Sequence, residues 1–347
     1  MAKLLEITGK AISGEWGQDD DTGTGIPVLR TTNFTNEGFV NYKNVVTRSI
    51  SKKNIAEKYL RHGDVIIEKS GGSDKQPVGR VIFFEGEENK YLFNNFTGLL
   101  RVQNPEEWLP KYVFYALYAY YRNGGTRAFE NRTTGLHNLQ VDNYVKSVDI
   151  PKLSYRKQQH ICETLDHVRD AVAYRERQLT KLDELVKARF VEMFGDPYTN
   201  SKDYPLKKGE SFFKLSNGKA VPESKRLNGG IPAYGGNGIS WYTDESLFDA
   251  DTIVVGRVGF QSGNVHLVKG PLWVTDNAMY MSSCDFSQYN LTFLIELMAH
   301  VDFTKFQDAG DLKKITQKPF MQFEYLCPPL SLQNQFAAFV AEVDKSK

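Results

Sequence analysis

The chain has 347 residues, of which 41% are hydrophobic and 24% charged, and its formal net charge is +1. These values are typical of an ordinary globular protein with room for two domains, and they argue against a protein that coats nucleic acid without sequence preference. No apolar run approaches the roughly 20 residues that cross a bilayer, and the N-terminus lacks the apolar core of a signal peptide. We therefore expect a cytoplasmic protein with no membrane contact.

Residues 1–150 have the pattern of a mixed domain of helices and short strands. The sequence predicts strands over 65–68, 80–84 and 99–102, separated by glycine breakers, and a helix over 108–121. This helix is apolar nearly all round, which is typical of a buried helix. Its tyrosines could instead form a base-stacking surface, but a core helix is the preferred interpretation.

A long helix is predicted over 155–194, where apolar side chains recur in alternating steps of four and three, the pattern of a coiled-coil seam. Because no Gly or Pro occurs before Gly195, we expect one helix of about 40 residues, or about 60 Å. Arg175 and Arg189 interrupt the seam and need polar partners, and the apolar stripe needs a second helix to cover it. The predicted seam consists of Ile161, Leu165, Val168, Val172, Leu179, Leu182, Val186 and Met193, and it continues near the C-terminus with Phe336, Val340 and Val343.

The sequence after this helix repeats the order of features before it. Ile26-Pro27 recurs as Ile231-Pro232, and the loop glycine Gly135 recurs as Gly310, with shorter connecting loops in the second copy. The fold class is therefore predicted as α+β, with two tandem copies of one domain joined by a coiled-coil helix. The predicted boundaries are 1–150 for the first domain, 151–196 for the long helix, 197–327 for the second domain, and 328–347 for a shorter second helix.

The cysteine and histidine pattern indicates no metal site and no disulfide framework. Cys162, Cys284 and Cys327 stand singly along the chain, so neither a CxxC zinc site nor a set of disulfides can be built from them. His160 and His167 lie seven positions apart on one predicted helix, too far for the usual ligand spacing. We assign no metal.

Signatures of catalysis are also missing from the sequence. Gly23-x-Gly25 leads into a strand pattern, whereas a phosphate-binding loop leads into a helix. The Asn-Pro-Pro-aromatic signature of adenine methylation does not occur, and the run from Asp183 to Lys187 is best explained as a solvated helix face. We therefore expect a chain without its own cofactor or catalytic residues.

The residues resemble the specificity subunit of type I restriction-modification systems along nearly the whole chain. The resemblance rests on Pro-x-Leu-Ser followed by Gln-x-x-Ile or Gln-x-x-Phe, which opens each predicted long helix at 151–161 and 328–336. It rests also on 63–72 with 77–80, and on 230–238 with 255–259 and 273–278. The second helix spans only 328–347, so we expect a truncated form of the second conserved helix.

The resemblance implies that each copy is a target recognition domain that reads one half of a split double-stranded DNA sequence. It implies that the two helices set the spacing and dock methyltransferase subunits, which bind S-adenosylmethionine, and that a restriction subunit joins the full complex. The exposed seam predicts either self-association through 156–194 or coverage by the methyltransferase subunits. A single-chain DNA modification enzyme and a coiled-coil scaffold that binds no DNA are the alternatives.

Both copies place cations in the segment that follows the domain helix, as phosphate binding requires. Hydrogen-bonding side chains in loops are candidates for contacts with base edges, although each could serve only as a structural surface residue. The predicted DNA-binding residues are Arg30, Thr31, Thr32, Asn33, Lys69, Ser70, Ser73, Lys75, Gln76, Arg127, Asn131, Arg132, Thr133, His137 and Asn138 in the first copy, and Tyr234, Asn237, Arg257, Gln261, Asn264, Lys305, Lys313 and Lys314 in the second.

Overall fold

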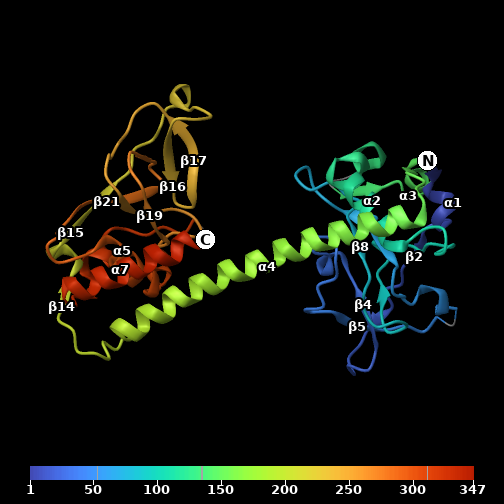
Figure 1. The fold of residues 1–347 in the computed structure, drawn as a ribbon, viewed down its shortest axis with the longest axis horizontal. Helices are drawn as coiled ribbons and strands as arrows, with labels where there is room; N and C mark the ends of the chain where they lie inside the picture. Colours follow the sequence, from blue (N-terminus) through green and yellow to red (C-terminus); the bar gives the residue numbers. More distant parts are fainter. Residues whose placement is uncertain (53, 134–135, 311) are drawn as a thin grey trace. The chain divides into compact units, whose positions relative to one another are not determined.

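The computed structural model describes residues 1–52, 54–133, 136–310 and 312–347, which divide into two compact units, 1–172 and 173–347. Each unit contains both helices and strands, so the mixed α+β class predicted from the sequence is confirmed (Figure 1). Gly135 lies outside the described residues, so its predicted correspondence with Gly310 is not compared.

The first unit is built on a sheet with the strand order β2-β10-β6-β8, in which every neighbouring pair is antiparallel. A second sheet has the order β3-β5-β4-β9, and its β4-β9 pair is parallel. The bounds are β1 (Ala2–Lys3), α1 (Leu4–Thr8), β2 (Ile12–Ser13), β3 (Gln18–Asp19), β4 (Ile26–Leu29), β5 (Val46–Ser49), β6 (Val65–Glu68), β7 (Ser70–Gly71), β8 (Val81–Phe83), β9 (Leu92–Phe93), β10 (Thr97–Leu100), α2 (Pro110–Arg122), β11 (Glu130–Thr133), β12 (Leu136–Leu139), α3 (Val141–Ser147), β13 (Asp149–Ile150) and α4 (Tyr155–Phe194).

The second unit contains a sheet of the same kind, β15-β21-β18-β19, again antiparallel throughout. Its smaller sheet, β17-β16-β20, also ends in a parallel pair, β16-β20. The bounds are β14 (Leu206–Lys208), β15 (Phe213–Asn217), β16 (Ile231–Gly235), β17 (Gly238–Thr243), β18 (Thr252–Gly256), β19 (Val265–Val268), β20 (Trp273–Val274), β21 (Ala278–Cys284), α5 (Leu291–His300), α6 (Lys318–Gln322), β22 (Glu324–Leu326) and α7 (Leu330–Lys345).

Each large sheet packs one face against a helix. In the first unit, Val113, Phe114 and Leu117 of α2 join Val65 and Ile67 of β6 in one buried cluster. Side chains on a strand alternate between faces, so the intervening residue of β6 points to a second cluster on the opposite face of the sheet. In the second unit, α5 covers its sheet in the same manner.

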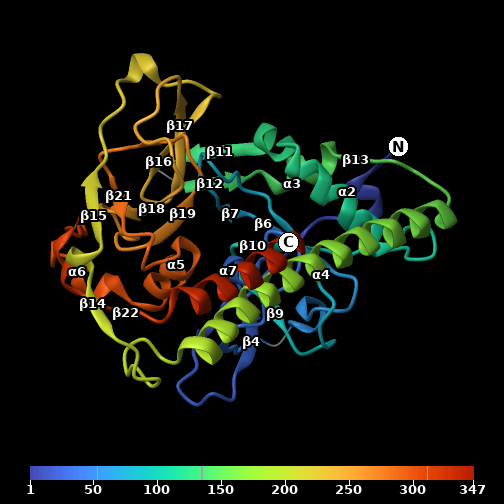
Figure 2. The same ribbon diagram turned by 60° about the vertical axis from the view of Figure 1, so that its left-hand side comes forward.

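The helix α4 contributes to both cores. Cys162 belongs to the core of the first unit, whereas Val186, Phe190 and Phe194 belong to that of the second. Within the second unit, α7 lies beside the latter half of α4, as Figures 1 and 2 both show. Phe190 and Phe194 each have ring centroids 5.6 Å from that of Phe336 near the start of α7.

The two arginines of the predicted seam have polar partners. Arg175 donates hydrogen bonds to the carbonyl oxygens of Ser346 and Lys347 just past α7, at 2.9 and 2.6 Å. Because Arg175 meets the end of α7 while Phe194 meets its start, the two helices run antiparallel. Arg189 forms an ion pair with Glu192 at 2.7 Å. Each guanidinium group therefore has a polar partner, although Nε of Arg189 is buried without a hydrogen bond.

Burial of the predicted seam residues changes along α4. Val186 and Met193 are buried, as are Phe336 and Val343 of α7. Leu165, Val168 and Val172 are instead exposed, Val168 to 56% of its surface. Partly buried seam residues are Ile161, Leu179, Leu182 and Val340. No helix within the described ranges is both long and apolar enough to span a membrane.

Candidate nucleic-acid interface

In each large sheet, two neighbouring strands form a hairpin, β6-β8 in the first unit and β18-β19 in the second. The loop of this hairpin is attached to the cation-bearing segment predicted from the sequence. In the first unit this loop follows β6, and its strand β7 pairs with β12, matching Ser70 with Asn138 and Gly71 with His137. In the second unit the loop follows β18, and Val258 forms a bridge with Lys314. The hairpin loop and the cationic segment thus form one continuous surface in each unit.

The loop of the first unit makes a tight turn that depends on two glycines. The amide of Ser73 donates to the carbonyl of Gln76 at 2.6 Å, which closes the turn. Gly71 has φ +141° and Gly72 has φ +60°, and a Cβ at Gly72 would lie 2.7 Å from the amide nitrogen of Val78. Side chains larger than glycine would therefore displace this turn.

The base of the same loop is fixed by a buried ion pair. Both Glu68 oxygens accept hydrogen bonds from the Arg80 guanidinium, at 3.0 and 3.1 Å, and Glu68 is fully buried. Arg80 also donates to the carbonyl of Thr31 at 3.2 Å. Because its donors are used inside the protein, Arg80 positions the loop.

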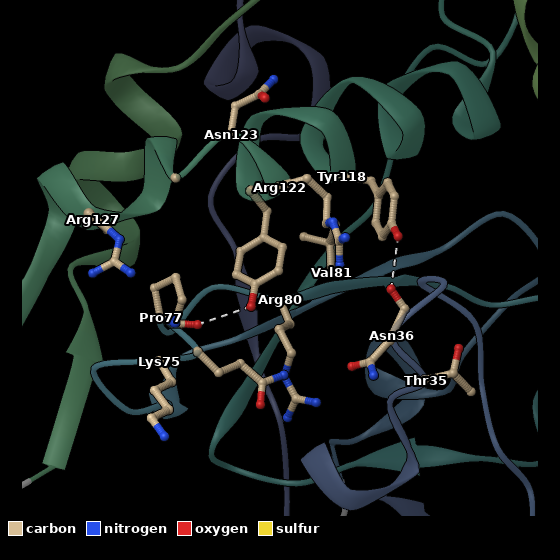
Figure 3. Close-up of a pocket in the computed structure, with 13 residues that line it drawn as sticks. Thr35, Asn36, Lys75, Pro77, Arg80, Val81, Tyr118, Arg122, Asn123 and Arg127 are labelled. Carbon is tan, nitrogen blue, oxygen red and sulfur yellow. Dashed lines mark hydrogen bonds between the residues drawn. The ribbon is translucent and has the colours of Figure 1, made fainter. Parts of the chain in front are cut away.

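A basic cleft of about 600 Å³ lies between this loop and the C-terminal end of α2 (Figure 3). The residues that line it are Thr35, Asn36, Lys75, Gln76, Pro77, Arg80, Val81, Tyr118, Tyr121, Arg122, Asn123, Gly124 and Arg127. Besides the ion-paired Arg80, this lining contains the cations Lys75, Arg122 and Arg127, and it contains no carboxylate. Such a cleft attracts a polyanion such as the DNA backbone.

Hydrogen bonds between neighbouring segments hold the walls of the cleft. The Tyr118 hydroxyl donates to the carbonyl of Asn36 at 2.8 Å, and the Tyr121 hydroxyl donates to that of Pro77 at 3.2 Å (Figure 3). Arg127 donates to the carbonyl of Asp74 at 3.3 Å. The tyrosines of α2 thus hold the segments at Asn36 and Pro77 in place on either side of the cleft.

The structure places the predicted DNA-binding residues in different environments. Ten are exposed: Thr32, Ser73, Lys75, Gln76, Arg127, Asn131, Asn237, Gln261, Lys305 and Lys314. Ten are partly buried: Arg30, Thr31, Lys69, Ser70, His137, Asn138, Tyr234, Arg257, Asn264 and Lys313. The side chains of Arg132 and Thr133 lie outside the described residues.

Asn33 differs from the other predicted contacts because it is buried, with 1% exposure. Its amide oxygen accepts from the Arg30 amide at 3.0 Å, and its amide nitrogen donates to the carbonyls of Asn41 and Lys43. It therefore shapes the loop, whereas a base reader needs free donors and acceptors at the surface. His137 is also engaged, with Nδ1 2.7 Å from a carboxylate oxygen of Glu130.

Two residues near these loops were not among the predicted contacts. Arg122 lines the basic cleft, and its position in the last turn of a predicted helix next to other arginines was a usable signal. Phe260 projects from the hairpin loop of the second unit with 91% exposure. Its position between Gly259 and Gly263 was the only indication in the sequence of an aromatic residue in a turn.

The three cysteines are free thiols, of which Cys162 is buried and Cys284 and Cys327 are partly buried. Burial raises the pKa of Cys162 to about 11 and that of Cys284 to about 11, which disfavours the thiolate that binds metal. Among the described residues, no group of three or more His, Cys, Asp or Glu side chains is arranged to hold a metal ion.

The fold is similar to solved structures of type I restriction-modification S subunits. It aligns with the S subunit from M. genitalium over 99% of this chain and 89% of that one, with a TM-score of 0.61 and 16% identity. It also aligns with a chain from a structural study of complex assembly and conformational transition in the type I restriction-modification system, over 99% of this chain and 90% of that one, with a TM-score of 0.52 and 13% identity. The chain therefore has the S-subunit fold.

Sequence comparison gives the same result. The chain is 23% identical over 120 residues to a putative type I restriction enzyme specificity subunit from Haemophilus influenzae, and 23% identical over 113 residues to the EcoprrI specificity subunit from Escherichia coli. These matches cover 34% and 33% of this chain but only 31% and 28% of the relatives. No family model matches the chain. Its resemblance to type I specificity subunits is thus confirmed in both sequence and fold.

Proposed function

We propose that this chain is the DNA-binding specificity subunit of a type I restriction-modification complex, and that each unit reads one half of a bipartite target. The main supporting observation is that both units attach the loop of the same hairpin to a cationic segment, through β7-β12 in one and the Val258–Lys314 bridge in the other. Cations fix the register on phosphates, and polar loop side chains read base edges. The proposed domain boundaries are 1–150, 151–196, 197–327 and 328–347.

The helices α4 and α7 would then set the distance between the half-sites and dock methyltransferase subunits. Leu165, Val168 and Val172 form an exposed apolar stripe on α4 that fits such a contact. In this proposal the chain has no catalytic role, methyltransferase subunits bind S-adenosylmethionine, and a restriction subunit completes the complex. The whole assembly acts in the cytoplasm.

The test is DNA binding by the purified chain over a range of salt concentrations, followed by methylation mapping with the assembled complex. Affinity should fall steeply with salt, and Arg127→Ala should reduce the slope of log K against log salt by roughly one unit. The absence of salt-dependent DNA binding, or methyl transfer by the isolated chain, would contradict the proposal. The alternatives of a scaffold and a single-chain enzyme predict those two outcomes respectively.

A further inference from the structure

Phe260 is the most exposed large apolar side chain among the described residues, at 91%. It lies at the tip of the loop between β18 and β19, in the interface surface of the second unit. Removal of such a side chain from water lowers the free energy. A folded protein that keeps the ring exposed therefore either accepts this cost or has a function for the ring. The structure around Phe260 favours a function for the exposed ring.

The backbone on both sides of Phe260 is held in one conformation. The Gly259 amide donates to the carbonyl of Lys313 at 2.8 Å, which ties the loop to the cationic segment. The amide group of Gln307 donates to the carbonyls of Phe260 and Ser262, at 3.3 and 2.6 Å. Gly259 has φ +100°, a backbone conformation that disfavours other residues at this position. The loop is therefore built to present the ring.

The charges beside this ring are mainly positive. Lys314 is exposed and forms a backbone bridge with Val258, Lys313 precedes it in the chain, and Arg257 begins the loop. The segment also carries two acidic residues in its sequence, Asp308 and Asp311, and the amide of Asp308 donates to the carbonyl of Lys314. An aromatic ring next to cations suits a partner with a negative backbone and flat apolar faces. Nucleic acid has both.

We propose that Phe260 is a wedge that stacks against a base step of the DNA half-site bound by residues 173–347. This inference rests on the proposed function and adds a mechanism to it. Apolar side chains that insert at a base step partly unstack it and bend the duplex, so that the cost depends on the sequence being deformed. Phe260 would thus contribute to specificity without hydrogen-bonding to any base.

The corresponding loop of the first unit carries no aromatic residue at its tip. Its tip residues include Lys75 and Gln76, and an exposed ring at the base of the loop is Phe96, at 52%. The Phe96 carbonyl accepts from the amides of Lys69 and Ser70 at the base of that loop. We therefore expect the wedge effect in the half-site of the second unit.

The experiment uses the full chain and a duplex that contains the mapped target, with 2-aminopurine placed in turn at each step of the half-site. The isolated chain should increase 2-aminopurine fluorescence at one step, because the fluorophore brightens when unstacked. Phe260→Ala should abolish this increase and weaken binding about tenfold, with an unchanged salt slope, since the ring carries no charge. Phe260→Trp should restore both properties.

Two matched variants distinguish the wedge from other effects. Phe286 is a second exposed phenylalanine, at 59%, beyond the far end of β21 from this loop, so Phe286→Ala should leave binding and fluorescence unchanged. Lys313→Ala should reduce the salt slope by about one unit but retain the fluorescence increase.

The outcomes separate the two proposals. If wild-type chain shows no salt-dependent DNA binding, the proposed function fails. If wild-type chain binds DNA and Phe260→Ala binds equally well with the same fluorescence change, the wedge is wrong while the function stands. If Phe260→Ala instead impairs only association with methyltransferase subunits, the ring belongs to a protein interface and the wedge is again wrong.

Discussion

A buried glutamine near the start of α4 and another near the start of α7 perform the same task. Gln158 is 1% exposed and accepts a hydrogen bond from the Leu109 amide while donating to the carbonyls of Glu107 and Leu153. Gln333 is fully buried, accepts from the Asn290 amide, and donates to two carbonyls in the same way. Gln158 thus joins the start of α2 to the start of α4, and Gln333 joins the start of α5 to the start of α7.

Replacement of either glutamine by leucine should destabilise its unit strongly. Gln333→Leu leaves one amide and two carbonyls without partners in a buried site, which should lower the free energy of unfolding by about 3 kcal/mol. Urea denaturation followed by near-ultraviolet circular dichroism measures this change. Gln322→Leu, at the exposed end of α6, is the control, and equal effects of the two substitutions would show that the hydrogen bonds of Gln333 matter little.

Glu296 on α5 should contribute less to the stability of the second unit at neutral pH than in mild acid. Burial raises its pKa above the ordinary value, although His300, Lys187 and Lys347 oppose the shift. The folded state therefore binds the proton more tightly than the unfolded state, and stability falls as pH rises from the unfolded-state pKa through the folded-state pKa. Glu296→Gln should raise the Tm at pH 7, and the gain should vanish as pH falls to about 4.

Thermal melts between pH 4 and pH 8 test this sign. Asp302→Asn is a useful comparison because its hydrogen bond from Thr304 lowers the pKa of Asp302, so that substitution should reduce stability at neutral pH. A gain for Glu296→Gln that is constant across the whole range would show that its effect is not due to ionisation.

At the scale of single elements, the sequence predicted the long helix better than the strands. The bounds 155–194 agree with α4 because the heptad pattern is unbroken and Gly195 ends it. The strand expected over 99–102 instead spans Thr97–Leu100. The Thr97 hydroxyl donates to the carbonyl of Asn94, and this turn begins the strand at Thr97. Because glycine usually interrupts a strand pattern, the adjacent Gly98 placed the predicted start after it.

The candidate site was less predictable than the fold. Cation-rich segments could be identified from composition, but the pairing of β7 with β12 joins residues about 70 positions apart, and no local pattern contains it. Asn33 is likewise buried because its amide group donates to the carbonyls of Asn41 and Lys43. The sequence of this polar loop does not tell whether that amide bonds to protein or to water.

The exposed stripe of α4 should drive association of the isolated chain. Val168→Lys with Val172→Lys places two charges in the stripe and should shift the chain toward monomer or weaken capture of methyltransferase subunits. Sedimentation velocity at micromolar concentration measures the first effect. His167→Lys with Ala171→Lys adds the same side chains on exposed positions outside the predicted seam. Identical behaviour of the two double variants would argue against the stripe as a contact surface.

At the scale of the whole molecule, the two units repeat one strand order, so specificity should be modular. In both large sheets the first strand in chain order pairs with the fourth, and the fourth with the second. If the proposed function holds, exchange of residues 1–150 for the corresponding domain of a type I specificity subunit should change one half of the methylated sequence and leave the other half unaltered. Methylation mapping measures this, and a change in both halves would contradict two independent readers.

Because Cys162 and Phe190 of α4 lie in different cores, this helix also affects how the protein folds. Starting a helix is costly whereas extending one is easy, so α4 can nucleate at each end where a core supports it and grow inward. Asp166 and Arg169 still contact the first unit, so the exposed residues around Val172 are the ones that would be helical by propagation from those two ends. Their amide hydrogens should exchange with solvent faster than those near either end of α4. The middle of α4 would then unfold locally, which allows the two units to fold and unfold independently.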